Sequence, residues 1–383
     1  MISADGNKEK DKIFFWALSS PSSIEKHIPF IQAARKLNLT SVLVSHEPNE
    51  QLLCADENHV IPLHDWQALH SLAKEAQPIL VMTQNCRLTP FLAPLALDLG
   101  IKCYTKNAAQ ILAYKDRWHH FLEQKGIPSP KTILPLQEFD FTGKIGGENP
   151  VVLKPSFSTG SVNTFVFENI HDLLLSLQNN SVLNENTQEP ISLSEIFAKN
   201  RANNDQGGYL VQEYVPFQWQ LGVEVFILNG QVNLIHPAEI LIDESGYKAY
   251  AHLGPIPIPP IIKDWFQDIA LQLGLFNCHL SPDILIGTDG NPYIIDVNLN
   301  IGGEGLIEAV KSRGLDYANE SLKSMLGLKA NWDCQKVAVV NYALPSFKDS
   351  SHVHVSREDS LDFPLFAKQR LDEWRDSFPP KIN

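Results

Sequence analysis

The chain has 383 residues, of which 44% are hydrophobic, so it can bury the cores of two or three domains. Its formal net charge of −13 argues against a nucleic acid or an anionic membrane as partner, because such surfaces would repel the protein at long range. The five cysteines lack the spacing of a zinc site or a disulfide framework, and the first apolar run is too short for a signal sequence or a membrane span. A cytoplasmic protein is therefore expected.

Residues 12–105 alternate short apolar runs with amphipathic stretches. The runs IFFWAL, SVLVS and PILVM predict strands, and the stretches PFIQAARKL and FLAPLALDLG predict helices. This alternation predicts a parallel sheet with helices on its faces. Because ligands bind outside the strand ends of such sheets, a small-ligand edge is expected here.

A helical segment, AAQILAYKDRWHHFLEQ, comes next and is stopped by Gly126 and Pro128. The expected domain boundary lies just before it. The stretch NPVVLKPSFSTGSVNTFVF then predicts a hairpin, and a helix is expected at residues 170–178.

Further antiparallel strands are expected after residue 208. One hairpin turns at Asn229-Gly230, and DILIGTDGNPYIIDVN forms two strands that turn at Asp289-Gly290. The stretch IKDWFQDIALQLGLF between them predicts an amphipathic helix, and a last helix is expected to end near residue 378.

Three oxygen-bearing side chains stand out on the strands around Asp289-Gly290. Asp296 and Asn298 share a strand face by the period of two, and Asp283 can lie opposite them. Converging oxygen ligands without His or Cys select a hard cation, so they predict a magnesium site that substrate phosphates complete. The alternative is a pair of solvated carboxylates at strand ends.

Two lysines point to an anionic ligand. Lys115 precedes a helix, and Lys154 lies within an apolar strand, where an unpaired ammonium would be costly. The turn after Lys154 carries backbone N–H and hydroxyl donors that can close over phosphate oxygens, from Ser156, Ser158, Thr159, Gly160 and Ser161. Alternatively, this turn merely connects two strands.

In LVQEYVP, Glu213 lies at the end of a strand, where the backbone leaving the sheet exposes N–H and C=O groups that could pair with an adenine edge. Taken alone, a surface glutamate in an ordinary strand explains the segment equally well.

Five segments, in this order, resemble successive parts of the ATP-grasp superfamily: YKDRWHHFLEQKGIPSPKT, PVVLKPSFSTGS, YLVQEYVPFQWQLGVEVFILNG, LGLFNCHLSPDILIGTDGNPYIIDVNLNIGG and GLDYANESLKSMLG. The most similar subgroup is that of carboxylate-amine ligases, such as amino-acid and dipeptide ligases. The resemblance implies an α/β fold that is α+β in its centre. It implies an N-terminal parallel α/β domain (1–110), a two-subdomain ATP-grasp region (111–330) with a lid at about 130–212, and a C-terminal segment (331–383) that closes the substrate side.

The resemblance also implies residue roles. Lys115 and Lys154 match the lysines that hold the α and β phosphates, and the loop 156–161 matches the lid over the triphosphate. Glu213, Tyr214 and Val215 match the hinge that receives the adenine. Many members place a glutamate on the ribose shortly after the hinge, and here the nearby candidates are Gln218 and Gln220, with Glu224 further on. Asp283, Asp296 and Asn298 match the magnesium ligands, with Asp where many members carry Glu.

One departure concerns the reacting centre. Carboxylate-amine ligases usually carry an arginine two residues after the metal-binding Asn, and here Asn300 occupies that place. A cation can come instead from Arg313, and backbone donors from Gly302 and Gly303 at the start of a helix. No side chain stands out as the catalytic base, although His279, Glu304 and His252 are candidates.

These observations predict an ATP-dependent ligase that joins a small carboxylate to an amine through an acyl phosphate. ATP and magnesium are the expected cofactors, with two ions bound and Mn²⁺ able to substitute, and a homodimer is left open. Two alternatives are a small-molecule kinase resembling polyol-phosphate kinases and a nucleotide-binding module without catalysis. The sparse basic residues near the site disfavour the kinase, and the intact lysines and aspartates disfavour the silent module.

Overall fold

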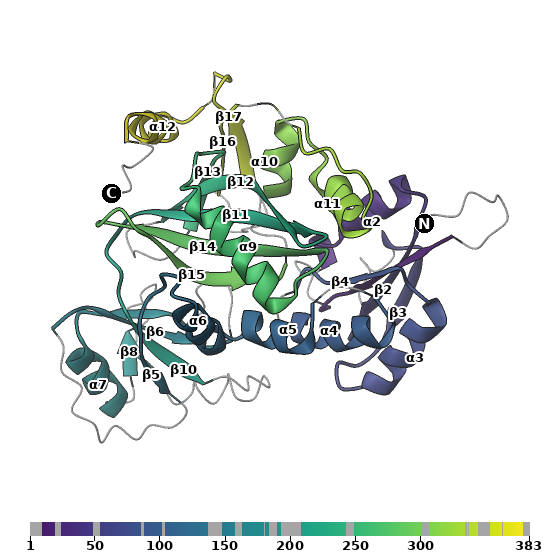
Figure 1. Cartoon of the computed structure of the whole chain (residues 1–383), viewed down its shortest axis with the longest axis horizontal. Coiled ribbons are helices and arrows are strands. Elements are labelled where there is room, and N and C mark those ends of the chain that lie inside the picture. Colours follow the sequence, from purple (N-terminus) through teal and green to yellow (C-terminus); the bar gives the residue numbers. More distant parts are fainter. Residues whose placement is uncertain are drawn as a thin grey trace.

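The computed structural model describes most of the chain and contains three main sheets, each with helices packed against it (Figure 1). The residues that it describes are 10–19, 24–48, 54–85, 88–101, 104–136, 148–157, 163–179, 181–183, 190–192, 208–242, 249–300, 306–333, 335, 337–343, 353–361 and 363–377. None of the helices in this part of the chain is both long and apolar enough to cross a membrane.

The N-terminal part is a four-stranded parallel sheet in the order β3-β2-β1-β4. Its strands are β1 (Lys12–Trp16), β2 (Thr40–Ser45), β3 (Glu57–Val60) and β4 (Leu80–Met82). The helix α2 (Ile28–Lys36) packs on one face of the sheet, and α3 (Trp66–Ala76) and α4 (Thr89–Asp98) pack on the other. The expected parallel sheet is confirmed, because its apolar runs are covered on both faces.

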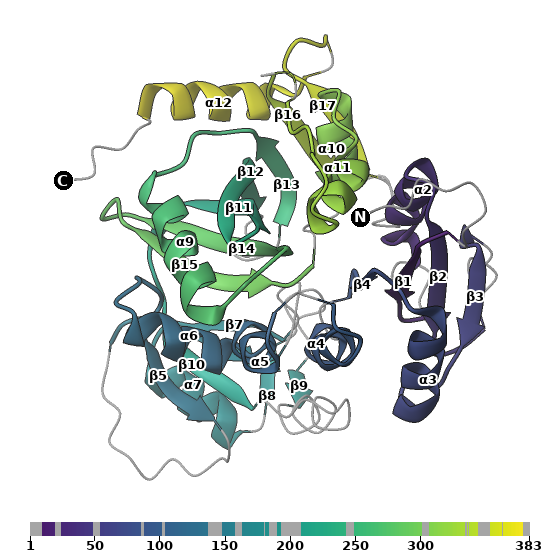
Figure 2. The ribbon, with the colours of Figure 1, turned by 45° about the vertical axis from the view of Figure 1, so that its right-hand side comes forward.

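The helical segment that follows is not one helix, as the sequence suggested, but two. The helix α5 (Lys106–Ala113) ends at Tyr114, and α6 (Lys115–Gln124) begins directly after it. Tyr114 is extended, with φ −106° and ψ 116°, so the chain changes direction there. Figure 2 shows α5 next to α4, between the N-terminal sheet and the rest of the molecule. The boundary expected at residue 110 therefore falls inside α5.

A second, antiparallel sheet has the order β5-β10-β6-β7. Its strands are β5 (Thr132–Leu136), β6 (Val151–Pro155), β7 (Phe165–Phe167) and β10 (Tyr209–Glu213), and α7 (Ile170–Gln178) packs against them. A two-stranded sheet of β8 (Ser181–Leu183) and β9 (Pro190–Ser192) lies between α7 and β10 in the sequence. These elements occupy the range expected for the lid, and we refer to them as the lid sheet.

The largest sheet has seven strands in the order β15-β14-β11-β12-β13-β16-β17. They are β11 (Phe217–Leu228), β12 (Gln231–Ile242), β13 (Ala249–Gly254), β14 (Cys278–Gly287), β15 (Pro292–Asn298), β16 (Val339–Ala343) and β17 (Val353–Arg357). The C-terminal residues thus extend this sheet through β16 and β17. The last helix, α12 (Leu365–Ser377), packs on Leu253 and Val340.

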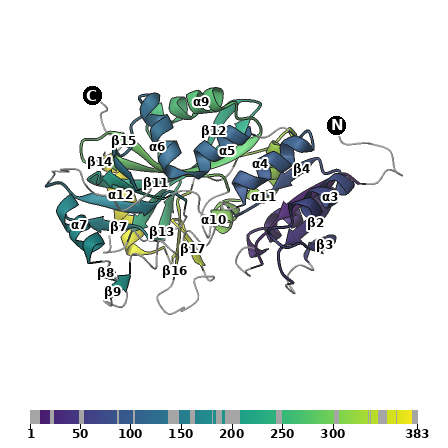
Figure 3. The same ribbon diagram turned by 90° about the horizontal axis from the view of Figure 1, so that it is seen from below.

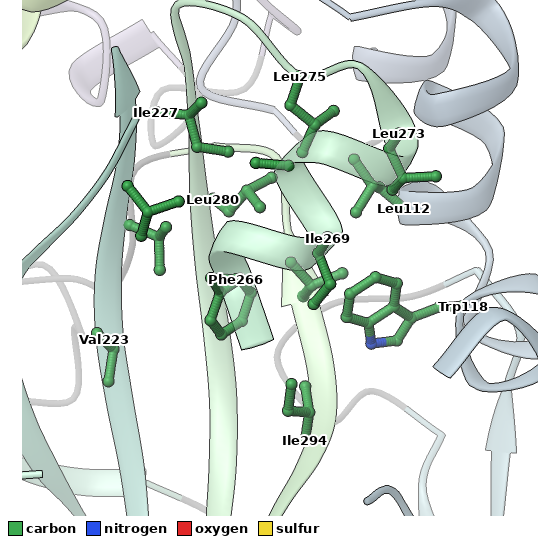
Figure 4. Close-up of a cluster of buried hydrophobic side chains, with 14 of the residues drawn as sticks. Leu112, Trp118, Val223, Ile227, Phe266, Ile269, Leu273, Leu275, Leu280 and Ile294 are labelled. Atoms are coloured by element: carbon green, nitrogen blue, oxygen red, sulfur yellow. The ribbon is translucent and has the colours of Figure 1, made fainter. Parts of the chain in front are cut away.

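One face of the large sheet is apolar and covered by helices. Residues such as Val223, Ile284 and Ile294 pack there against Phe266 of α9 (Ile261–Leu273) and Trp118 of α6 (Figure 4). Figure 3 shows α5, α6 and α9 together on this side. Side chains alternate along a strand, so the residues between the apolar ones on β11 and β14 lie on the opposite face of the sheet. They include Glu224, Ser281 and Asp283. We refer to this face as the polar face.

Two more helices connect the polar face to the N-terminal sheet. Val310 of α10 (Leu306–Ser312) and Tyr317 of α11 (Tyr317–Met325) share one core with Phe226 of β11 and Phe15 of β1. This shared core fixes the position of the N-terminal sheet relative to the polar face.

Candidate nucleotide and metal site

The three predicted metal ligands lie on neighbouring strands. Asp283 of β14 is the register partner of Asp296 of β15, and Ser281 is the partner of Asn298. The two strands are joined by a turn in which Gly290 has φ +81°, a conformation that favours glycine. The expected pairing of Asp283 with Asp296 is therefore found, although the pairs nearer the turn are offset by one residue and a register shift between Asp283 and Ile284 restores it. Asp283, Asp296 and Asn298 thus lie on neighbouring positions of the sheet.

Lys115 comes to this pair of aspartates from α6. It is the first residue of that helix, and its Nζ lies 2.5 Å from Oδ2 of Asp296. Its backbone N–H donates to the carbonyl of Ser156, at 2.7 Å, because the chain bends at Tyr114. Only 7% of Lys115 is exposed. The break between α5 and α6 thus places an ammonium beside the predicted metal site.

Lys154 comes from the lid sheet. Its Nζ donates to the carbonyl of Ile295, at 3.1 Å, and lies 3.5 Å from Nε2 of His119. Since Ile295 precedes Asp296 on β15, both lysines end at the same strand. Lys154 is only 8% exposed, so its ammonium has largely lost its hydration. A buried ammonium of this kind is suited to an anionic ligand.

The pKa shifts show that burial disfavours the charged forms of both an acidic and a basic residue at this site. Burial, and then the Asp296 carboxylate, raises the pKa of Asp283 to about 7. Burial lowers the pKa of Lys154 to about 8, against the opposing attraction of Asp296. Burial and the charge of Lys154 hold the pKa of His119 well below its usual range. A cation near Asp283 and an anion near Lys154 would each relieve the cost of these buried charges.

The loop after Lys154 is described only at its start. The hydroxyl of Ser156 donates to Asp116, and its N–H donates to the carbonyl of Gly208 at 2.8 Å. Both donors of Ser156 are therefore engaged within the protein. The other predicted loop residues, Ser158, Thr159, Gly160 and Ser161, lie outside the described residues.

The predicted adenine hinge follows β10 and joins the lid sheet to the large sheet. The N–H of Glu213 donates to Lys131, and that of Tyr214 donates to Pro150, both at 3.0 Å. The N–H of Val215 makes no hydrogen bond with any residue that the structure describes. A base edge placed here would therefore use the Val215 N–H. Gln220 lies on β11 opposite Leu285 and two residues from Gly222, the register partner of Asp283.

Arg313 is buried between other elements, whereas Asn300 lies at the end of a strand of the site. Arg313 is 5% exposed, and its guanidinium donates to the carbonyl of Gln335 at 2.9 Å and to Nδ1 of His236 at 2.7 Å. These bonds anchor Arg313 between α10 and β12. Asn300 lies half-buried just beyond β15. Gly302 and Gly303 lie outside the described residues.

Two features of the site were not predicted. His119 contacts Lys154 and lies four residues after Lys115 on α6, so the helical spacing of two polar residues was the available signal. The second feature is the network around Glu224, which the sequence offered only as a distant ribose candidate. Its buried carboxylate accepts from Ser281 at 3.1 Å and from the Tyr317 hydroxyl at 3.2 Å. His279 also contacts Glu224. Nothing in the sequence pairs these residues, because they come from three separate elements.

The donor set fits a magnesium nucleotide. Within the described ranges, no three His, Cys, Asp or Glu side chains form a group that could hold a metal by themselves. Asp283, Asp296 and Asn298 instead offer two carboxylates and one amide. Magnesium typically binds through one or two carboxylates and completes its shell with phosphate and water oxygens. The neighbouring Lys115 and Lys154 supply the charge that phosphates require.

No known family model matches the chain, and no curated protein matches it in sequence. Solved structures do match it. An L-amino acid ligase from Bacillus licheniformis superposes with a TM-score of 0.65 at 16% identity, covering 88% of this chain and 81% of that chain.

Two further structures are similar to the same extent. The biotin carboxylase domain of a Hydrogenobacter thermophilus 2-oxoglutarate carboxylase matches with a TM-score of 0.64 at 16% identity, covering 88% of this chain and 75% of that one. A phosphoribosylglycinamide synthetase from Anaerococcus prevotii matches with a TM-score of 0.61 at 14% identity, covering 96% and 98%. The predicted fold class, a parallel α/β part followed by an ATP-grasp fold, is therefore confirmed.

Proposed function

We propose that this protein is an ATP-dependent ligase that activates a small carboxylate as an acyl phosphate and joins it to an amine, releasing ADP and phosphate. One observation carries the proposal. Lys115 from α6 and Lys154 from the lid sheet meet at the strand that carries Asp296, opposite Asp283. Polyphosphate chemistry needs such an arrangement of positive charge next to metal-binding oxygens. The likeness to an L-amino acid ligase and a phosphoribosylglycinamide synthetase supports the same class of reaction.

In this proposal, the side chains mainly position and neutralise the reactants. Lys115 and Lys154 bind phosphate oxygens, and their present partners, Asp296 and the Ile295 carbonyl, are released as they do so. Asp283, Asp296 and Asn298 hold magnesium, which supplies further neutralisation of phosphate charge. The hinge at Val215 orients the adenine. Because the acyl phosphate is sensitive to water, the lid sheet excludes solvent while the amine attacks.

The remaining parts of the proposal concern ligands and assembly. ATP and magnesium are the cofactors, with two ions at the site and Mn²⁺ as a substitute. The Hydrogenobacter domain is described as a complex with ADP and with its magnesium salt, which supports this choice. The substrates are a small carboxylate and an amine, and the protein works in the cytoplasm. A homodimer is compatible with the dimer described for the Hydrogenobacter domain.

The test is trapping of the acyl phosphate. Purified protein is given ATP, magnesium, hydroxylamine and pooled small carboxylates, and hydroxamate, ADP and phosphate are measured. We expect hydroxamate with the wild type and a loss of about 1,000-fold in Asp296→Asn, since this change removes a metal ligand and the partner of Lys115.

A matched control is Glu239→Gln. Glu239 is a buried carboxylate of the same sheet that pairs with Arg370 of α12, and it is not among the residues assigned to the nucleotide or the metal. This variant should keep its hydroxamate activity once folded. ADP formation without phosphate or hydroxamate would favour a kinase instead, and retained ADP binding without turnover would favour a silent nucleotide-binding module.

A further inference from the structure

The neighbouring strands β1 and β4 of the parallel N-terminal sheet differ in where the chain goes after them. After β1 the chain runs into α2, which shares a core with Ile13 and Phe15. After β4 it runs into α4, which shares the opposite core with Phe14 and Trp16. The two connections thus leave neighbouring strands toward opposite faces of the sheet. In open α/β sheets this is the topological switch point, and ligands bind outside the carboxyl ends of the strands there.

Gln84 lies at this switch point, two residues beyond the end of β4. It is only 6% exposed. Its backbone N–H donates to Nε2 of His27 at 2.9 Å, and His27 is fully buried, so the backbone of Gln84 is held firmly. The side-chain amide of Gln84 makes no hydrogen bond with any described residue. Since no described residue uses this amide, both its donor and its acceptor atoms are available for a ligand.

A second donor lies beyond the end of β2, on the other side of β1. Nδ1 of His46 accepts from the Ser19 N–H at 3.1 Å, so in the neutral imidazole the proton is on Nε2. His46 is half-buried, and Ser19 follows β1. Because β2 and β4 both flank β1, they lie about 10 Å apart, which suits a small molecule.

The neighbouring polar side chains are already used. The hydroxyl of Ser45 donates to the Glu47 carbonyl at 2.6 Å, and that of Thr83 accepts from the Asn85 N–H at 3.0 Å. Both bonds close turns. The Gln84 amide and the His46 imidazole are therefore the groups at this edge that suit a ligand. Two neutral N–H donors match the oxygens of a carboxylate, and neither would place a second negative charge beside it.

We propose that a crevice at this switch point, with Gln84 and His46, binds the carboxylate group of one of the two substrates. The inference rests on the proposed function, which requires a small carboxylate, and adds the place and the side chains that select it. The core shared by β1, β11 and α11 connects this edge to the polar face, where the nucleotide site lies.

The experiment measures ligand binding without turnover. Thermal unfolding of the protein with magnesium and ADP is followed in the presence of each proteinogenic amino acid and each of a set of small mono- and dicarboxylic acids. We expect at least one of them to raise the unfolding temperature of the wild type. In Gln84→Leu, which has nearly the same volume but no amide, the apparent affinity should fall about 10- to 100-fold, while ADP affinity stays within twofold.

Thr83→Val is the matched control, since it alters the adjacent buried residue without removing the amide. It should lower stability slightly and keep the carboxylate affinity. If Gln84→Leu does not fold, Gln84→Glu is used instead, because it has the same size and repels an anion.

The possible outcomes separate the two proposals. Equal carboxylate affinity in wild type and Gln84 variants would overturn the inference even if hydroxamate is formed. A wild type that binds no member of the set would also overturn it. Carboxylate binding that depends on Gln84, in a protein that forms no hydroxamate, would support the crevice and count against the ligase reaction.

Discussion

The two regions to which we assign ligands differ in their electrostatics. The polar face of the large sheet gathers two aspartates and two lysines, and their charges shift the pKa values of Asp283 and Lys154 strongly. The edge of the N-terminal sheet carries neutral donors, and its His46 is bound through an ordinary hydrogen bond to Ser19. Holding a triphosphate requires assembled charge, which destabilises the free protein. Holding one carboxylate does not, so that edge can be built from amides and imidazoles.

The largest expected effect is on stability, and it comes from truncating a core residue under each of the two regions. Trp118 is fully buried between α6 and the large sheet (Figure 4), and α6 carries Lys115. Trp118→Ala should lower the free energy of unfolding by about 3–5 kcal/mol, as large-to-small core changes do. It should also weaken ADP binding in the folded fraction, because α6 shifts. Urea unfolding and ADP titration measure the two effects.

Trp16→Ala is the matched variant in the N-terminal sheet, where Trp16 is 2% exposed. It should cost a similar amount of stability and spare ADP affinity. Equal losses of ADP affinity in both variants would show that the two regions are not separable in this way.

The next effect is on nucleotide affinity alone. Lys154→Met keeps the apolar stem and removes the ammonium, so ADP affinity in magnesium should fall about 100-fold, the value of a strong charge-assisted contact. Lys125→Met, an exposed lysine just beyond α6, is the control and should leave ADP affinity unchanged. A loss below about threefold in Lys154→Met would contradict the assignment of this lysine to phosphate.

A smaller effect concerns the cost of the assembled charge. The pKa of Asp283 is raised in the folded state, to about 7, from 3.8. Its contribution to stability is therefore present below about pH 4 and is lost as the pH rises to 7. Asp283→Asn removes this loss, so without magnesium it should be more stable than the wild type at pH 8 by roughly 2 kcal/mol. It should be inactive in the hydroxamate assay.

Magnesium with ADP should abolish that difference, because the cation favours the ionised Asp283. If Asp283→Asn is less stable than the wild type at pH 8 without ligands, the ionised Asp283 does not destabilise the folded protein and the prediction is wrong.

The smallest effect has the opposite pH dependence, because it comes from a residue whose pKa is lowered on folding. Burial, and then the charge of Arg313, lowers the pKa of His236 from 6.5 to about 3. Because the unfolded state binds the proton more tightly, stability is lost as the pH falls from about 6.5 toward 3. His236→Asn retains an acceptor for Arg313 and tolerates the φ of +46° at this position. Between pH 6.5 and 5, the wild type should lose roughly 1 kcal/mol more stability than this variant. Parallel unfolding curves against pH would contradict this.

The predictable part of the site lay within single hairpins and helices. The pairing of Asp283 with Asp296 followed from the alternation of strands and the turn at Gly290, and the structure has that register. Helix boundaries near residues 170 and 178 and the strands of the N-terminal sheet were also predictable, because they depend on local periodicity. The helix break at Tyr114 was not. Its extended backbone is stabilised by a bond from Lys115 to Ser156, 41 residues away in the sequence.

The sequence by itself determined the fold class, the strand register of the candidate metal ligands and the order of the segments that resemble an ATP-grasp enzyme. The tertiary structure alone decided which polar groups from distant parts of the chain meet. Lys115 and Asp296 are 181 positions apart, and Gln84 and His27 are 57 apart. Periodicity and turn residues act over a few neighbours, whereas contacts between separate elements depend on how whole sheets and helices pack. For that reason the buried Glu224 network and the contact between Gln84 and His27 appeared only with the fold.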